Sequence, residues 1–71
     1  MFDEDCVRLG ARIRELRTAK GWRQIDLGQH TGIHEVHISD IERGATEIGF
    51  KRLVAIAKAF GVSLSVLCDR V

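Results

Sequence analysis

The stretch QIDLGQHTGIHEVHISDIER, residues 24–43, decides how this chain folds. Leu27 and Gly28 belong to a first short helical pattern, which Gly32 interrupts before a second pattern begins. Two helices that cross steeply must come very close, so the small Gly28 suits the crossing point, and Gly32 can take the positive φ of a tight turn at little cost. Apolar residues of the two patterns are then left to pack both helices against a third element: Leu27, Ile33, Ile38 and Ile41. This spacing predicts a helix-turn-helix.

The rest of the chain also has helical spacing, with no proline and no long alternation of apolar and polar residues. We therefore predict an all-α fold of five short helices. The expected helices cover about 5–20, 26–30 with Gln24 near its start, 35–43 before Gly44, about 50–60 before Gly61, and a short last segment capped by Ser63. In the fourth helix the predicted buried stripe is Phe50, Leu53, Ile56, Ala57 and Phe60.

Length and composition narrow the class of protein. Seventy-one residues predict one domain over residues 1–71, with no separate sensor or cleavage domain. The net charge is only +1, although six of the eleven basic residues fall within residues 8–23. No apolar run is long enough to span a membrane, and the acidic start does not resemble a signal peptide, so we expect a cytoplasmic protein. Cys6 and Cys68 lack metal or redox spacing and are expected to be reduced thiols.

With this layout, the chain resembles the Cro/repressor-type (XRE-like) helix-turn-helix family. The resemblance rests on RIRELRTAKGWRQIDLG (12–28), ISDIERG (38–44) and LVAIAKAFGVSLSVL (53–67). It implies a compact five-helix lambda-repressor-like domain that binds double-stranded operator DNA as a two-fold dimer, with the third helix in the major groove. It also implies that Gln24 binds a phosphate, and that Arg17 and Glu42 form a partly buried ion pair.

The helical period itself indicates which side of the third helix is available to DNA. If Ile38 and Ile41 point inward, the outward positions include Val36, which can pack on a thymine methyl, and Ser39, which can pair with several bases. The outward carboxylate of Glu35 or Asp40 can accept a hydrogen bond from a cytosine amine. The polar side chains that suit phosphates are Arg23, Gln24, Arg43 and Thr46. The expected DNA contacts are Arg23, Gln24, His34, Glu35, Val36, Ser39, Asp40, Arg43 and Thr46.

Two departures from the family pattern concern this same helix. His34 stands where relatives usually have Ser or Thr as the N-cap; imidazole caps less well, so we expect a frayed start. Between residues 34 and 43 there are three acids and one base, a net charge that repels phosphates unless His34 and His37 are protonated. Affinity is then expected to come from the first helix, the loop after Gly44 and dimerisation.

Ile48 stands where relatives often have proline, and Val66 where they usually have an acid. With Cys68 and Val71 they lie in the C-terminal part of the chain, where many members of the family it resembles dimerise. These apolar residues predict a two-fold interface, formed by Ile48, Val66, Cys68 and Val71.

Two alternatives remain open at this point. A zinc site could be built from His30, His34 and His37, but Gly32 breaks the helix between them and no CxxC motif supports it. We therefore expect neither a metal nor a cofactor. The other alternative is a protein-interaction module, such as an antitoxin that neutralises a partner protein. An enzyme is not expected, because no nucleophile–base pair or carboxylate dyad lies in a recognisable pocket. The favoured hypothesis is a homodimeric, sequence-specific DNA-binding transcriptional regulator acting on a palindromic operator.

Overall fold

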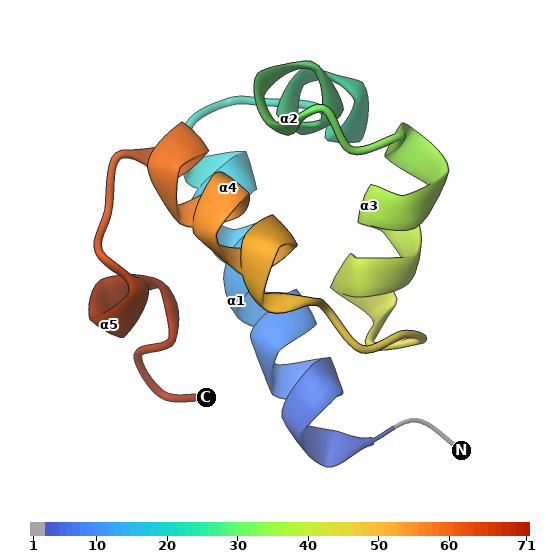
Figure 1. Cartoon of the computed structure of the whole chain (residues 1–71), viewed down its shortest axis with the longest axis vertical. Coiled ribbons are helices and arrows are strands. Elements are labelled where there is room, and N and C mark those ends of the chain that lie inside the picture. The colour runs from blue at the N-terminus through green and yellow to red at the C-terminus, as the bar shows by residue number, and fades with distance from the viewer. Residues whose placement is uncertain (1–2) are drawn as a thin grey trace.

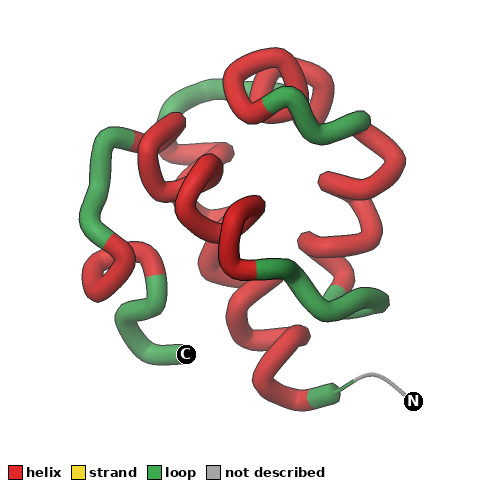
Figure 2. Tube along the Cα trace, viewed as in Figure 1, coloured by secondary structure: helices red, strands yellow, loops and turns green. Residues whose placement is uncertain are grey.

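The computed structural model describes residues 3–71, within which the chain forms five α-helices and no strand (Figures 1 and 2). They are α1 (Glu4–Ala19), α2 (Gln24–Thr31), α3 (Glu35–Arg43), α4 (Phe50–Phe60) and α5 (Leu64–Leu67). The predicted all-α, five-helix fold is therefore confirmed, and α3 has the predicted bounds. Residues 1 and 2 of the expected domain lie outside the described residues.

The ends of the helices follow from side chains that stop or start them. Asp3 caps α1 by accepting the amide of Asp5 at 2.8 Å, and Ser63 caps α5 by accepting the amide of Val66 at 3.2 Å. Gly32 ends α2 with φ 76°, the left-handed value that the turn requires. The predicted role of Gly32 is confirmed.

Every helix contributes one fully buried aliphatic side chain to a single core. These are Ile13, Leu27, Ile38, Ile56 and Leu67. Because α5 is only four residues long, Leu67 is its anchor in the core. Burying each such side chain stabilises the fold by about 1.5–3 kcal/mol. The apolar stripe of α4 was predicted one residue too long, since Phe50 at its first position is 70% exposed.

Two glycines allow helices to approach more closely than any side chain would permit. A Cβ on Gly28 would lie 2.6 Å from the carbonyl oxygen of Ile33, so the predicted crossing of α2 and the turn needs this glycine. Gly10, in the middle of α1, is more constrained: a Cβ there would lie 2.2 Å from the carbonyl oxygen of Ile41. Gly10 thus sets the distance between α1 and the C-terminal end of α3.

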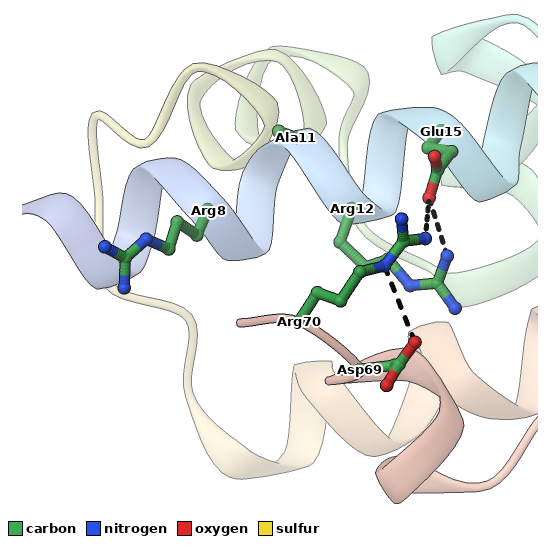
Figure 3. Close-up of a pocket in the computed structure, with 6 residues that line it drawn as sticks. All are labelled: Arg8, Ala11, Arg12, Glu15, Asp69 and Arg70. Atoms are coloured by element: carbon green, nitrogen blue, oxygen red, sulfur yellow. Dashed lines mark hydrogen bonds and ion pairs between the residues drawn. The ribbon is translucent and has the colours of Figure 1, made fainter.

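The C-terminal segment is fastened to α1 by charged side chains. Arg12 donates to the carbonyls of Val66 and Leu67 at 2.9 and 3.3 Å, which satisfies the end of α5. Glu15 lies between Arg12 and Arg70 (Figure 3), with N···O distances of 2.6 and 3.4 Å. The hydrogen bond from Arg12, and then the charge of Arg70, lower the pKa of Glu15 below its ordinary value.

The packing leaves α3 and α5 on opposite sides of the molecule, with α1 and α4 between them (Figure 1). Across residues 3–71, no helix has the length and apolar character needed to cross a membrane.

Candidate nucleic-acid interface

Helix α3 has one buried side and one exposed side. Ile38 is fully buried and Ile41 is 3% exposed, whereas Val36 is 59% exposed. Glu35, His37 and Arg43 are exposed as well, and the helix lies at the edge of the fold (Figure 1). The outward side is therefore open to a partner along the length of the helix.

The other predicted contacts surround this surface but differ in exposure. Ser39 and Asp40 are half buried, so they present only part of their side chains. Thr46 is exposed in the loop after α3, where its hydroxyl donates to the carbonyl of Glu47 at 3.3 Å.

The start of α3 is ordered, contrary to the expectation of a frayed end. His34 has extended backbone angles, φ −62° and ψ 143°, and its Nδ1 accepts the amide N–H of Val36 at 3.1 Å. This is the hydrogen bond that Ser or Thr makes at an N-cap. The expectation was wrong because it compared average capping preferences and did not consider that Nδ1 reaches the second amide of the helix.

The acidic charge of α3 is also less repulsive than the sequence indicates. Asp40 forms an ion pair with Arg43 one turn along the helix, and Glu42 is paired with Arg17 of α1. Of the three acids, Glu35 is the one outside these pairs. Counting charges along the helix overstated the repulsion by one charge, because the partner of Glu42 is Arg17 on α1, whereas Arg43 was already in the count.

Arg17 and Glu42 form a nearly buried ion pair that connects α1 to α3. Arg17 Nε donates to Glu42 Oε2 at 2.6 Å and Nη2 to Oε1 at 3.0 Å, with side-chain exposures of 11% and 3%. Arg17 also donates to the carbonyl of Trp22 at 2.7 Å. Gln24 at the start of α2 donates to Glu42 Oε1 at 3.1 Å, so its amide is oriented from within the protein. One network thus fixes α1, α2 and α3 relative to one another.

Arg23 stands exposed immediately before α2, next to Asp26. The Asp26 carboxylate accepts the backbone N–H of Arg23 at 2.8 Å and hydrogen bonds from its guanidinium at 3.2 Å. The hydrogen bonds from Arg23 lower the pKa of Asp26, and the same pairing raises the pKa of Arg23. The guanidinium is therefore held, fully charged, at the entrance to the helix-turn-helix.

A hollow lies between α2 and the first turn of α3. Its lining includes His34 and Glu35 from the predicted site, together with Ile25 and Gln29 of α2. Sequence reasoning placed neither Ile25 nor Gln29 at the site. Their spacing of four residues, which places them on one side of α2, was available from the sequence, but their exposure was not.

The predicted dimer residues fall into two groups. Ile48 and Val71 line one hollow together with Leu53, beside the N-terminal half of α1. Val66 is 46% exposed on α5 and Cys68 is half buried, and neither lines that hollow. Phe50, which lies one turn before Leu53 on α4, was missed as a surface residue because the helical period assigned it to the core.

The histidines do not gather around a common point. His30 stacks on Trp22, with ring centroids 4.2 Å apart, while His34 caps α3. Among residues 3–71 there is no group of three or more His, Cys, Asp or Glu side chains that could hold a metal ion.

The chain belongs to the XRE-type helix-turn-helix family, whose family model it matches over residues 13–67. It is similar to control protein C.BamHI of Bacillus amyloliquefaciens, at 34% identity over 61 residues that cover 84% of this chain and 75% of that protein. It is 32% identical over 65 residues, or 92% of this chain, to the HTH-type transcriptional regulator DdrOP3 of Deinococcus deserti. The chain spans half the length of DdrOP3.

Solved structures of helix-turn-helix regulators also resemble this chain. The restriction-modification controller protein C.AhdI of Aeromonas hydrophila superposes with a TM-score of 0.89 at 32% identity, over 92% of this chain and 98% of that one. The P22 c2 repressor, in complex with a synthetic operator, superposes with a TM-score of 0.77 at 39% identity, over 83% and 89%. These relatives thus include a transcriptional regulator, a restriction-modification controller and a repressor in complex with a synthetic operator, which supports a DNA-binding regulator.

Proposed function

We propose that this protein is a sequence-specific transcriptional regulator that inserts α3 into the major groove of a palindromic operator. The observation that carries the proposal is the two-sided α3, with Ile38 fully buried beneath and Val36 59% exposed above. A major groove about 12 Å wide admits one α-helix. Val36 and Ser39 then meet base edges, as do Glu35 and Asp40 where cytosine amines are presented.

Phosphate contacts position the helix in this proposal. Arg23 and Arg43 flank the exposed side of α3, and both guanidiniums are exposed although each has a carboxylate neighbour. Gln24, His34 and Thr46 add neutral donors near the same backbone. Neutral and charged donors to phosphates fix the register on the duplex without reading its sequence.

The regulator acts in this proposal as a homodimer. Ile48, Leu53 and Val71 line one hollow, and Phe50, one turn before Leu53 on α4, is 70% exposed. We call these four residues the apolar patch and propose that it is the interface, since grouped exposed apolar residues mark interaction surfaces. Val66 on α5 and Cys68 directly after it extend the interface. Aromatic residues dominate the binding energy of many interfaces, so we assign Phe50 the largest share. A two-fold dimer places its two α3 helices about 34 Å apart, one turn of DNA.

Among regulators, control of a restriction–modification system is the role that the comparisons favour. C.AhdI, named as such a controller, matches nearly the whole of both chains. The expected site of action is the DNA upstream of the protein's own gene, in the cytoplasm of a prokaryotic cell.

Selection from a pool of random duplexes tests the proposal. The protein is expected to enrich an inverted repeat with half-sites about 10 base pairs apart. With two arginines from each of two protomers at phosphates, log affinity falls against log salt with a slope of about −3.6. No enrichment at low salt, together with tight binding to the product of an adjacent gene, would instead establish the antitoxin-like interaction module.

A further inference from the structure

His34 makes a hydrogen bond that determines where its ring proton lies. The backbone amide of Val36 is a donor, so the Nδ1 that it contacts at 3.1 Å has to offer a lone pair. A neutral imidazole carries one N–H and one acceptor nitrogen. With Nδ1 as the acceptor, the proton resides on Nε2, and a doubly protonated ring is incompatible with the cap.

The main chain of the same residue is fixed as well. The carbonyl of His34 accepts the amides of His37 and Ile38 at 2.9 and 3.1 Å, so its main chain is fixed by the first turn of α3. Its side chain is fixed by the amide of Val36. The main chain and the ring of His34 are thus each held by hydrogen bonds before any partner arrives, which reduces the entropy lost on binding.

The free N–H of this ring lies on the surface assigned to DNA. His34 is exposed and lines the hollow between α2 and α3, next to Glu35. Nδ1 is turned toward the backbone of α3, which leaves Nε2 on the outer edge of the ring. Among residues 3–71, Nε2 makes no hydrogen bond.

We propose that His34 is a positioned hydrogen-bond donor, locked by its own capping bond in the Nε2–H form, that binds an acceptor atom of the operator. The acceptor is a phosphate oxygen or the N7 or O6 edge of a purine, which share this chemistry. The inference rests on the proposed function and deepens it, because it assigns one side chain two coupled tasks. A Ser or Thr at this position would cap α3 but would have no hydrogen-bond donor as far from the backbone as Nε2.

The ring proton is measured directly by long-range ¹H–¹⁵N correlation of the histidine side chains in the DNA-free protein. At a pH where the rings are neutral, His34 is expected to show the pattern of a single Nε2–H form. Exposed His37, which makes no capping bond, is expected to average between the two forms. A Nδ1–H pattern at His34, or the same averaging as at His37, would overturn the inference.

Two substitutions separate capping from donation. His34→Asn keeps a cap acceptor near the position of Nδ1 but has no donor at the position of Nε2; His34→Gln keeps the reach of the donor but loses the cap. We expect His34→Asn to melt at or above the wild-type temperature, yet to bind the duplex selected by the wild-type protein about 3- to 10-fold more weakly. We expect His34→Gln to melt lower than His34→Asn. Unchanged affinity in His34→Asn would leave His34 as a cap alone.

The same binding series identifies the acceptor. Weakening of His34→Asn by the same factor on selected and on scrambled duplexes indicates a phosphate, whereas loss confined to the selected duplex indicates a base edge. If the wild-type protein selects no duplex, the proposed function and the donor role both fail. If it selects one and His34→Asn binds it equally well, only the donor role fails.

Discussion

Replacing Glu42 by alanine should be among the most destabilising single changes in this protein. The substitution removes a carboxylate whose side chain is 3% exposed and leaves Arg17, 11% exposed, with the carbonyl of Trp22 as its remaining acceptor. It also removes the acceptor of the Gln24 amide. Breaking a buried pair by removing one partner costs about 3–5 kcal/mol. For a domain of this size, each kcal/mol lowers the melting temperature by about 4–8 °C.

The expected fall in melting temperature is therefore at least about 12 °C, measured by circular dichroism at 222 nm and pH 7. Glu47→Ala is the matched control, since Glu47 is exposed and makes no ion pair among the described residues; a change within about 4 °C is expected. The double variant Arg17→Met/Glu42→Leu removes both charges and should be more stable than Glu42→Ala. Equal effects of Glu42→Ala and Glu47→Ala would refute the reasoning.

Three further changes test other parts of the structure. Asp26→Asn should lower the melting temperature at pH 7. The difference from wild type should shrink as the pH falls below about 4, because the folded protein lowers the pKa of Asp26 and the carboxylate stops stabilising the fold once it is protonated. A difference that does not depend on pH would contradict the pairing with Arg23. Gly10→Ala should lower the free energy of unfolding in urea by about 1–3 kcal/mol, although alanine favours helix, since the added methyl meets a backbone carbonyl. Phe50→Ser should be a monomer by analytical ultracentrifugation, without lowering the melting temperature of the monomer. Ile25→Ser, at another exposed apolar site, should remain a dimer. If both variants are dimers, the apolar patch is not the interface.

The sequence allowed α3 to be predicted well because its two signals are local. A buried isoleucine pair three residues apart defines one side, and Gly44 with φ 72° defines the end. Gly28 was also predictable, since a helix-turn-helix requires a close contact at a fixed offset from the turn. Both predictions needed only residues within about one turn of each other.

Features that depend on distant partners were harder to predict. The need for Gly10 arises from the carbonyl of Ile41 on another helix, which the pattern of α1 alone cannot reveal. Phe50 fits the apolar period of α4, but the period does not show that the first turn extends beyond the core. The capping bond of His34 was missed for a different reason, because it depends on the side chain's rotamer.

Methylation interference on the selected duplex tests the central claim most directly, since it reports which groove α3 enters. Dimethyl sulfate modifies guanine N7 in the major groove and adenine N3 in the minor groove. We predict that N7 methylation blocks binding at two clusters about one helical turn apart, and that N3 methylation between them does not. Interference confined to adenine N3, or none at either atom, would contradict the account.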